Sequence, residues 1–129
     1  MEEFLIISLG TKERFAVPLS KVARVVHGFE VTTMPGTPRG LKGMTSIDGS
    51  LYGVIDLTET FDIQSATEPK HGLLVEMEHK CVLEVCAVET IVAALPRPIP
   101  DNDTVEAGFH LEGSPIFILN LEKIRRRFF

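Results

Sequence analysis

The sequence is short of several residue types, and each shortage narrows the class of protein it can be. Its 129 residues include no tryptophan, one tyrosine and two cysteines. Cys81 and Cys86 are five positions apart in a strand-like stretch, so their side chains should point to opposite faces and a mutual disulfide is geometrically awkward. We therefore expect buried thiols, as in a reducing compartment, and a core that needs neither a disulfide nor a structural metal.

Positive charge is also scarce. The 13 basic and 18 acidic side chains leave a net charge of −5, which argues against a nucleic-acid or anionic-membrane partner because such binding relies on clustered positive potential. The only basic run, Arg125 to Arg127, is expected to be the solvated end of a C-terminal helix, where cations suit the helix dipole. An RNA-contacting tail is the alternative for this run.

Long apolar runs are missing as well. No run approaches the roughly 18 residues that span a bilayer. The start, Met1-Glu2-Glu3, is acidic where a signal peptide would be basic. We expect a cytoplasmic protein without membrane insertion.

Strand-forming residues are abundant instead. Valine (12), isoleucine (10) and threonine (10) outnumber alanine (7), which favours strands over helices. Short β-rich runs alternate with turn residues, so the prediction is an all-β fold with short helical turns. Hairpins are expected where residues 4–9 meet 15–19, 41–47 meet 51–57, and 73–77 meet 81–85. A helical turn capped by Ser20 and a polar linker over 62–70 are expected between them.

The chain contains an internal duplication. Residues 48–57 align without a gap to residues 112–121 at an offset of 64, and residues 87–92 match residues 21–26. Each copy, of about 60 residues, is near the lower size limit for independent stability. Two small barrels that pack together are therefore predicted, because closing a short sheet removes its exposed edges. We expect a groove between the two copies where a partner can bind.

Signatures of catalysis are absent from the sequence. There is no G-x-S-x-G nucleophile motif and no glycine-rich phosphate or dinucleotide loop. The histidines lie far apart, and Asp101-Asn102-Asp103 lacks the glycine of a calcium loop. The sequence thus predicts no metal, no cofactor and no enzyme, although a carboxylate pair assembled by the fold stays open. The four histidines are His27, His71, His79 and His110.

Residues 43–57 resemble the signature G-V-I-N-L-R-G-x-V-x-P-V-I-D-L of CheW-like domains, the bacterial chemotaxis adaptors. Other family features follow in order along almost the whole chain. They are an opening hairpin (4–9 with 15–18), K-V-x-E-I (21–25), a proline loop (34–38), V-D-x-V (85–88) and a closing L-L-D-L-E-K-L (118–124).

This resemblance implies one CheW-like domain over residues 1–129, with two five-stranded SH3-like barrels packed together. The barrels would cover about 13–65 and about 72–120, with terminal strands exchanged between them. The resemblance also implies a scaffold without catalysis. Its partners would be the regulatory domain of a CheA-type histidine kinase and the cytoplasmic tip of a chemoreceptor.

The sequence departs from the family at two charged positions. Asp48 stands where the family has arginine, and Arg24 where it has glutamate. If the two side chains face each other, the reversal preserves an ion pair; the alternative is that both are solvated and contribute little. Ser46, Gly53 and Cys86 also differ from the family, so a divergent receptor contact, or a role outside chemotaxis, is expected.

The candidate kinase- or receptor-binding residues, carried over from the family's motifs, are Val22, Arg24, Gly43, Ser46, Asp48 and Gly49. For Val22 and Gly43 a structural role is favoured over a binding role, because an apolar strand residue and a turn glycine usually serve packing and backbone geometry. Asp48 is the strongest candidate because a charged side chain at a hairpin turn is exposed. A small β-barrel that binds nucleic acid is a second hypothesis, and it would require a basic face with exposed aromatic rings.

Overall fold

The computed structural model describes residues 1–10, 13–64, 71–75, 79–100 and 105–128. Most of these residues form strands, which confirms the predicted all-β class. The strands are β1 (Glu2–Ser8), β2 (Arg14–Pro18), β3 (Val22–His27), β4 (Thr32–Thr33), β5 (Leu41–Ile47), β6 (Ser50–Asp56), β7 (His71–Val75), β8 (Cys81–Val85), β9 (Ala87–Ala94), β10 (Arg97–Pro98), β11 (Val105–Leu111) and β12 (Ser114–Leu119). The helical elements are a 3-10 turn, η1 (Leu19–Lys21), and the helices α1 (Leu57–Thr60) and α2 (Leu121–Phe128).

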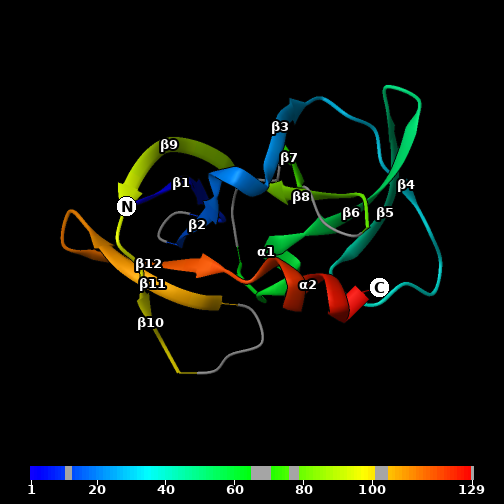
Figure 1. Cartoon of the computed structure of the whole chain (residues 1–129). Coiled ribbons are helices and arrows are strands. Elements are labelled where there is room, and N and C mark those ends of the chain that lie inside the picture. Colours follow the sequence, from blue (N-terminus) through cyan, green and yellow to red (C-terminus); the bar gives the residue numbers. More distant parts are fainter. Residues whose placement is uncertain (11–12, 65–70, 76–78, 101–104, 129) are drawn as a thin grey trace.

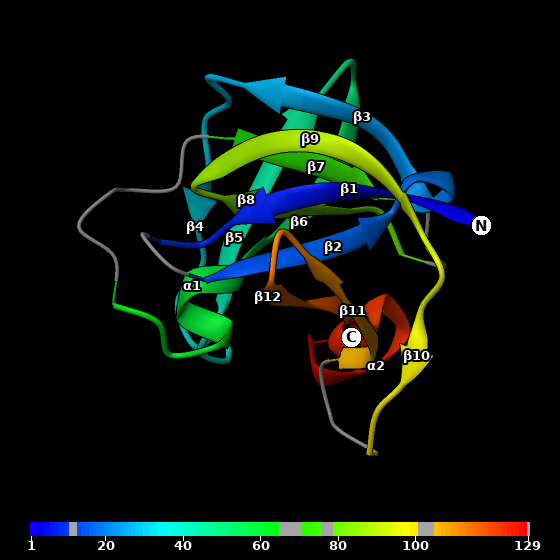
Figure 2. The same cartoon turned by 90° about the vertical axis from the view of Figure 1, so that its left-hand side faces the viewer.

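The strands make two six-stranded sheets that lie side by side (Figure 1). The first sheet has the order β3-β7-β8-β6-β5-β4, and the second has the order β10-β11-β12-β2-β1-β9. Each contains five longer strands and one strand of two residues, β4 or β10. Figure 2 shows β1 between β9 and β2 in the second sheet, with β3 and β7 behind them in the first.

Each half of the chain contributes a hairpin to the sheet built mainly from the other half. The β1–β2 hairpin belongs to the second sheet, and the β7–β8 hairpin belongs to the first. The range of about 13–65 expected for the first barrel therefore includes β2, which lies in the second sheet. Likewise, the range of about 72–120 includes β8, which lies in the first sheet. The joining contacts are parallel pairings of β8 with β6 and of β2 with β12.

The duplication is visible in the backbone. Asp48-Gly49 and Glu112-Gly113 turn the two equivalent hairpins with the same positive φ values, 51° and 82° against 52° and 81°. The strand register shifts between Leu41 and Gly43, and again at the equivalent positions 105 and 107. Two positive-φ residues are what a tight two-residue hairpin requires, so the repeated sequence produces a repeated turn and a repeated bulge.

The apolar core explains why the two halves of the chain pack together. Side chains alternate along β1, so Phe4 and Ile6 fill the interior of the second sheet while Leu5 and Ile7 face the first sheet. The largest apolar cluster joins both sheets and both helices through residues such as Leu73, Leu83, Leu119 and Ile124.

The groove expected between the two copies stays a prediction, while the largest apolar cluster packs side chains of both sheets together. A hollow of about 110 Å³ is lined by Pro18, Lys21, Glu106 and residues 119–122, where the second sheet meets α2. Larger hollows open elsewhere on the two sheets.

The structure shows the predicted hairpins and the predicted C-terminal helix, but not the predicted helix cap at Ser20. The three hairpins are confirmed by the pairings of β1 with β2, β5 with β6 and β7 with β8. The C-terminal helix is confirmed as α2, and Arg126 and Arg127 are exposed as predicted, but the expectation that Arg125 is solvated is wrong because its side chain is buried beside Glu122 and His79. Ser20 is not the cap of the helical turn, because it lies inside η1, whose N-cap is Pro18. Residues 11–12, 76–77 and 101–103 and most of the expected linker lie outside the described residues.

Candidate functional site

All six candidate residues lie on the first sheet. Val22 and Arg24 belong to β3, Gly43 and Ser46 to β5, and Asp48 and Gly49 make the turn between β5 and β6. Strand β3 is one edge of this sheet, and β5 is next to the opposite edge strand, β4. Curvature of the sheet brings these two regions together although no backbone ladder joins β3 to β5.

Arg24 of β3 is in direct contact with Asp48 of the β5–β6 turn. We call the exposed edge of the first sheet formed by Arg24, Ser46 and Asp48 the rim. The Arg24 guanidinium donates a hydrogen bond of 2.6 Å to the Asp48 carboxylate. The two side chains are 50% and 74% exposed, so water and salt screen the pair. The contact therefore sets the charge and shape of the rim more than it stabilises the fold.

The turn itself holds Asp48 outward. Asp48 has a φ of 51° and Gly49 a φ of 82°, and aspartate tolerates this conformation better than most residues. Nothing lies within 4 Å of the position that a Cβ would take on Gly49. Gly49 thus serves the turn conformation and leaves open space beside Asp48.

Gly43 and Val22 lie beneath the rim and fix the positions of the strands that carry it. A Cβ on Gly43 would overlap the carbonyl oxygen of Thr32 in β4, so the close approach of β4 to β5 requires glycine at this position. Val22 packs against the core cluster that joins the sheets. These two residues position the strands, whereas Arg24, Ser46 and Asp48 are exposed.

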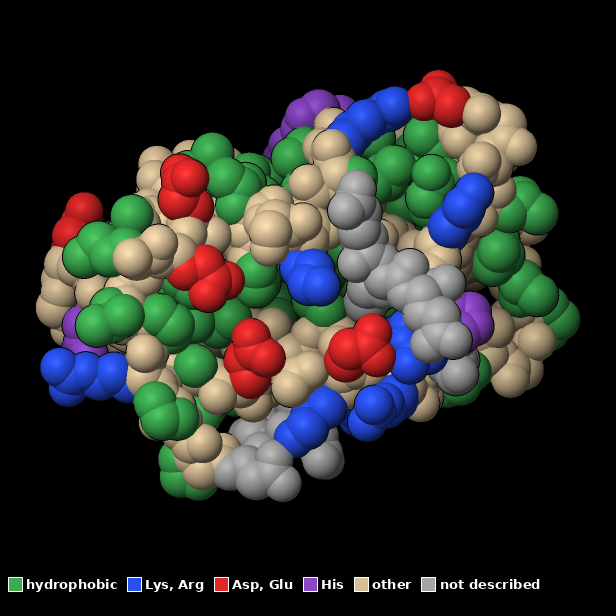
Figure 3. Space-filling model, viewed as in Figure 1, with side chains coloured by type: hydrophobic (Ala, Val, Ile, Leu, Met, Phe, Trp, Pro, Cys, Tyr) green, Lys and Arg blue, Asp and Glu red, His purple; other side chains and the backbone are tan. Residues whose placement is uncertain are grey.

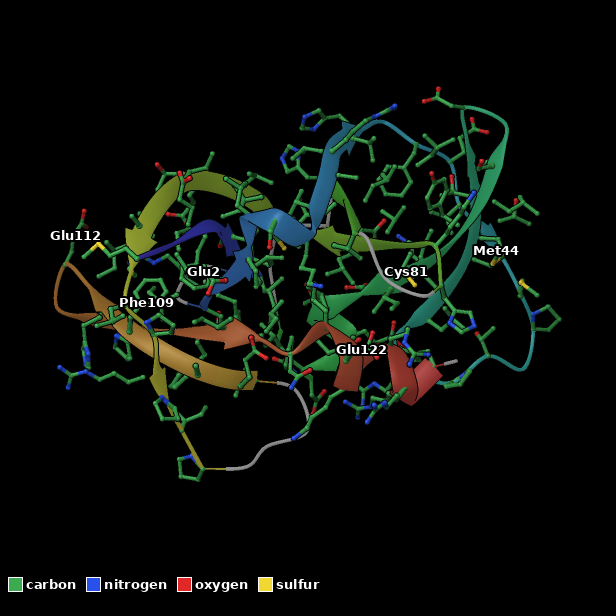
Figure 4. All side chains as sticks on the ribbon, in the orientation of Figure 1. Glu2, Met44, Cys81, Phe109, Glu112 and Glu122 are labelled. Atoms are coloured by element: carbon green, nitrogen blue, oxygen red, sulfur yellow. The ribbon has the colours of Figure 1, made fainter. Side chains whose placement is uncertain are left out.

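Ser46 borders a hollow of about 600 Å³ on the outer face of the first sheet. Met44 and Leu51 line the same hollow, and Leu51 is 66% exposed. Figure 4 shows Met44 on the outer side of β5, close to the β4 edge. Neither Met44 nor Leu51 is among the candidate residues predicted from the sequence. The available signal was the alternation along β5 and β6, which places Met44, Ser46 and Leu51 on one face.

The second sheet carries an equivalent hollow of about 530 Å³. It is lined by residues such as Leu95, Phe109 and Phe117, and includes Arg97 and His110; Phe109 is marked in Figure 4. The duplication therefore yields two related surfaces with different chemistry, one more polar and one more aromatic. None of the candidate binding residues predicted from the sequence lies on the second surface.

Charged side chains gather along the edge formed by α2, where acidic residues lie next to a run of basic ones (Figure 3). Arg125 hydrogen-bonds to Glu122 at 3.0 Å and lowers the pKa of that carboxyl group. The positive charges of α2 are thus interleaved with acidic groups, which does not favour a nucleic-acid surface. Within the described part of the chain, no helix is long and apolar enough to cross a membrane.

Both cysteines are buried and are not joined by a disulfide, in agreement with the prediction from their spacing. Burial raises the pKa of the Cys81 thiol to about 11, and the nearby Arg125 charge only partly opposes this. A thiol of this kind is inert at neutral pH. Cys81 is therefore a core residue and does not belong to the candidate site.

The fold and the exposed rim define a class of protein: a duplicated pair of small β-barrels with exchanged hairpins and an exposed pair of opposite charges on the first sheet. Comparison with known proteins narrows this class. The model of the CheW-like domain family matches residues 3–128, so the chain belongs to the CheW-like domain family.

Two known proteins illustrate this membership. The chain is 27% identical over 118 residues to the chemotaxis protein CheW of Klebsiella aerogenes, across 87% of this chain and 70% of that protein. It is also similar to the crystal structure of the scaffolding protein TtCheW from Thermoanaerobacter tengcongensis, with a TM-score of 0.84 and 25% identity over 92% of this chain and 88% of that one. The two SH3-like barrels expected from the resemblance are confirmed.

Proposed function

We propose that this protein is a non-enzymatic adaptor that couples a CheA-type histidine kinase to chemoreceptors through protein contacts in the cytoplasm. The observation that carries the proposal is the family match over residues 3–128. Its similarity to a chemotaxis protein and to a scaffolding protein supports the same role.

The proposed contact surface is the rim of the first sheet. Arg24, Ser46 and Asp48 are exposed there on rigid strands or a tight turn, which suits recognition because little side-chain and backbone freedom is lost on binding. Val22 and Gly43 act as supports, and Gly49 as the turn residue. The Arg24–Asp48 pair presents both charges in one place, so a matching partner surface would offer an acid and a base in the complementary order.

The test is calorimetric titration of the purified protein with the regulatory domain of its host's CheA-type kinase and, separately, with the cytoplasmic tip of a host chemoreceptor. Binding to both is the expected result. Binding to the kinase alone would indicate that the receptor surface has diverged, and binding to neither would contradict the proposal and favour a CheW-like module of another signalling pathway.

The duplication offers a matched control for the contact surface. D48R and E112R make similar changes at equivalent turns, since both positions are exposed and have nearly the same φ. D48R should weaken binding of one partner by about tenfold, as expected for a lost charge contact of about 1.4 kcal/mol. E112R should leave that affinity unchanged. Equal effects of the two substitutions would contradict the assignment of the contact to the first sheet.

A further inference from the structure

Two histidines far apart in the sequence meet on the first sheet. His27 is the last residue of β3 and His71 is the first residue of β7, and the two are direct partners in the antiparallel register. Their Nδ1 atoms are 2.5 Å apart, and their rings are perpendicular, with centroids separated by 4.6 Å. Figure 3 shows histidine side chains gathered over β3 at the upper edge of the molecule.

The short separation means that the two rings share a hydrogen bond between their Nδ1 atoms. One Nδ1 must donate and the other must accept, because two unprotonated nitrogens, or two protonated ones, would repel each other at this distance. Both nitrogens therefore point at one shared position. A transition-metal ion needs the same arrangement of imidazole nitrogens, with metal–nitrogen bonds of about 2.0–2.1 Å.

The pair opens onto a hollow of about 590 Å³ that Phe29, Lys42 and Glu84 also line. Lys42 forms an ion pair of 2.9 Å with the buried Glu84 carboxylate. A Cβ added to Gly72, the residue after His71, would lie 2.7 Å from the Phe29 ring. This close packing at Gly72 holds the end of β7 beside β3, while the hollow leaves space next to the imidazoles.

We propose that His27 and His71 form a two-histidine binding site for a divalent transition metal, with Cu²⁺ preferred over Ni²⁺ and Zn²⁺. Imidazole ligands suit these ions, and Cu²⁺ binds most tightly in this series. The donor ring then changes tautomer, its proton moving from Nδ1 to its own Nε2 by way of solvent, so that both Nδ1 atoms are free to bind the metal as neutral imidazoles. The nitrogens then separate from 2.5 Å to about 3 Å or slightly more, as the bond lengths require. The position of both residues at strand ends allows this movement.

The remaining coordination positions face the hollow. Among the described residues, no group of three histidine, cysteine or acidic side chains is placed to hold a metal, so water or a donor from another molecule completes the coordination. The site is independent of the proposed adaptor function. The sequence alone predicts no metal site, because 44 positions separate the two histidines.

The experiment uses the full chain without an affinity tag, titrated with Cu²⁺ in a non-coordinating buffer. Calorimetry should give one saturable equivalent, and the electron paramagnetic resonance spectrum should show two nitrogen ligands. Binding should weaken on acidification, because the metal competes with protons for the ring nitrogens.

Three variants connect the signal to the pair. H27N and H71N should each weaken Cu²⁺ binding by tenfold or more, since even loss of a supporting group around a metal costs about 10–100-fold. H110N, an exposed histidine of β11 in the other sheet, should leave binding unchanged. Metal-free urea unfolding of each variant checks that the fold is intact.

The proposal fails if the wild-type titration does not saturate at one equivalent. It also fails if the spectrum shows fewer than two nitrogen ligands, a result that needs no variant. Equal losses in H110N and H27N would likewise overturn it, because they would indicate unspecific binding to surface histidines.

Discussion

Whether Arg24 and Asp48 form an ion pair depends on the distance between them in the folded protein. Both reverse the family's charge, and the structure places them 2.6 Å apart on different strands. The reversal therefore keeps an ion pair at the rim. Its effect on folding is limited by its exposure, whereas the charges that it displays support the proposed role in recognition.

The pair can be measured by a double-mutant cycle. D48R should lower the free energy of unfolding by up to about 1 kcal/mol from loss of the pair and repulsion, in addition to the backbone cost of arginine at positive φ. R24E with D48R should recover the electrostatic part. Urea unfolding at low and high salt is the measurement, and the coupling should shrink in salt.

E112R is the control for the backbone cost, because Glu112 has a φ of 52° in the equivalent turn. D48N removes the charge and retains a residue that tolerates this conformation. Simple additivity of R24E and D48R would contradict the pairing.

Cys81 gives a prediction for the dependence of stability on pH. Its pKa is about 11 in the folded protein, against an ordinary value of 9.0. As pH rises, the Cys81 thiol therefore loses its proton at a lower pH in the unfolded chain than in the folded protein. The contribution of Cys81 to the free energy of unfolding is present in full below pH 9 and is lost between about pH 9 and 11. The free energy of unfolding should fall by about 2–3 kcal/mol over this window, at 1.36 kcal/mol per pKa unit.

Comparison of the wild type with C81A isolates this effect, since all other groups titrate in both proteins. Urea unfolding under reducing conditions should show the difference in free energy changing above pH 9 and constant below it. A difference independent of pH up to 11 would show that Cys81 does not titrate in this manner.

At the scale of elements, the duplication repeats helix capping as well as turns. Asp56 precedes α1, and its side chain accepts hydrogen bonds from the backbone N–H groups of Thr58 and Glu59 at 3.0 and 3.3 Å. Asn120, 64 positions later, accepts from Lys123 N–H at 3.1 Å before α2. Each cap orients a helix that follows with a buried leucine, Leu57 or Leu121.

D56A and N120A should each lower the free energy of unfolding by about 1 kcal/mol, the usual effect of losing a side-chain cap. D56N and N120D keep an accepting oxygen and should remain near wild-type stability. The measurement is urea unfolding followed by circular dichroism. An alanine variant as stable as its conservative counterpart would contradict the capping role.

Local chemistry explains which elements could be predicted from the sequence. Asp48-Gly49 fixes its hairpin because the backbone conformation is encoded in two adjacent residues. The hollow beside Met44 and Leu51 and the contact of His27 with His71 could not be found in this way. They depend on which strands become neighbours, and short apolar strands do not encode their distant partners.

At the scale of the whole molecule, the exchanged hairpins make the two sheets depend on each other. β2 is a central strand of the second sheet, yet η1 connects it directly to β3 in the first. The largest apolar cluster draws residues from both sheets. Neither sheet retains its strand order or its buried face if the other unfolds.

We therefore expect the two sheets to unfold in one cooperative transition. Because the natural sequence has no tryptophan, Y52W reports on the first sheet and F117W on the second. Within each variant, the urea midpoint from tryptophan fluorescence should coincide with that from far-ultraviolet circular dichroism, as two-state behaviour requires. The comparison within one variant removes the effect of the substitution on stability. If fluorescence of either reporter changes before the circular dichroism signal, one sheet unfolds alone, and the shared core and exchanged hairpins do not couple the sheets.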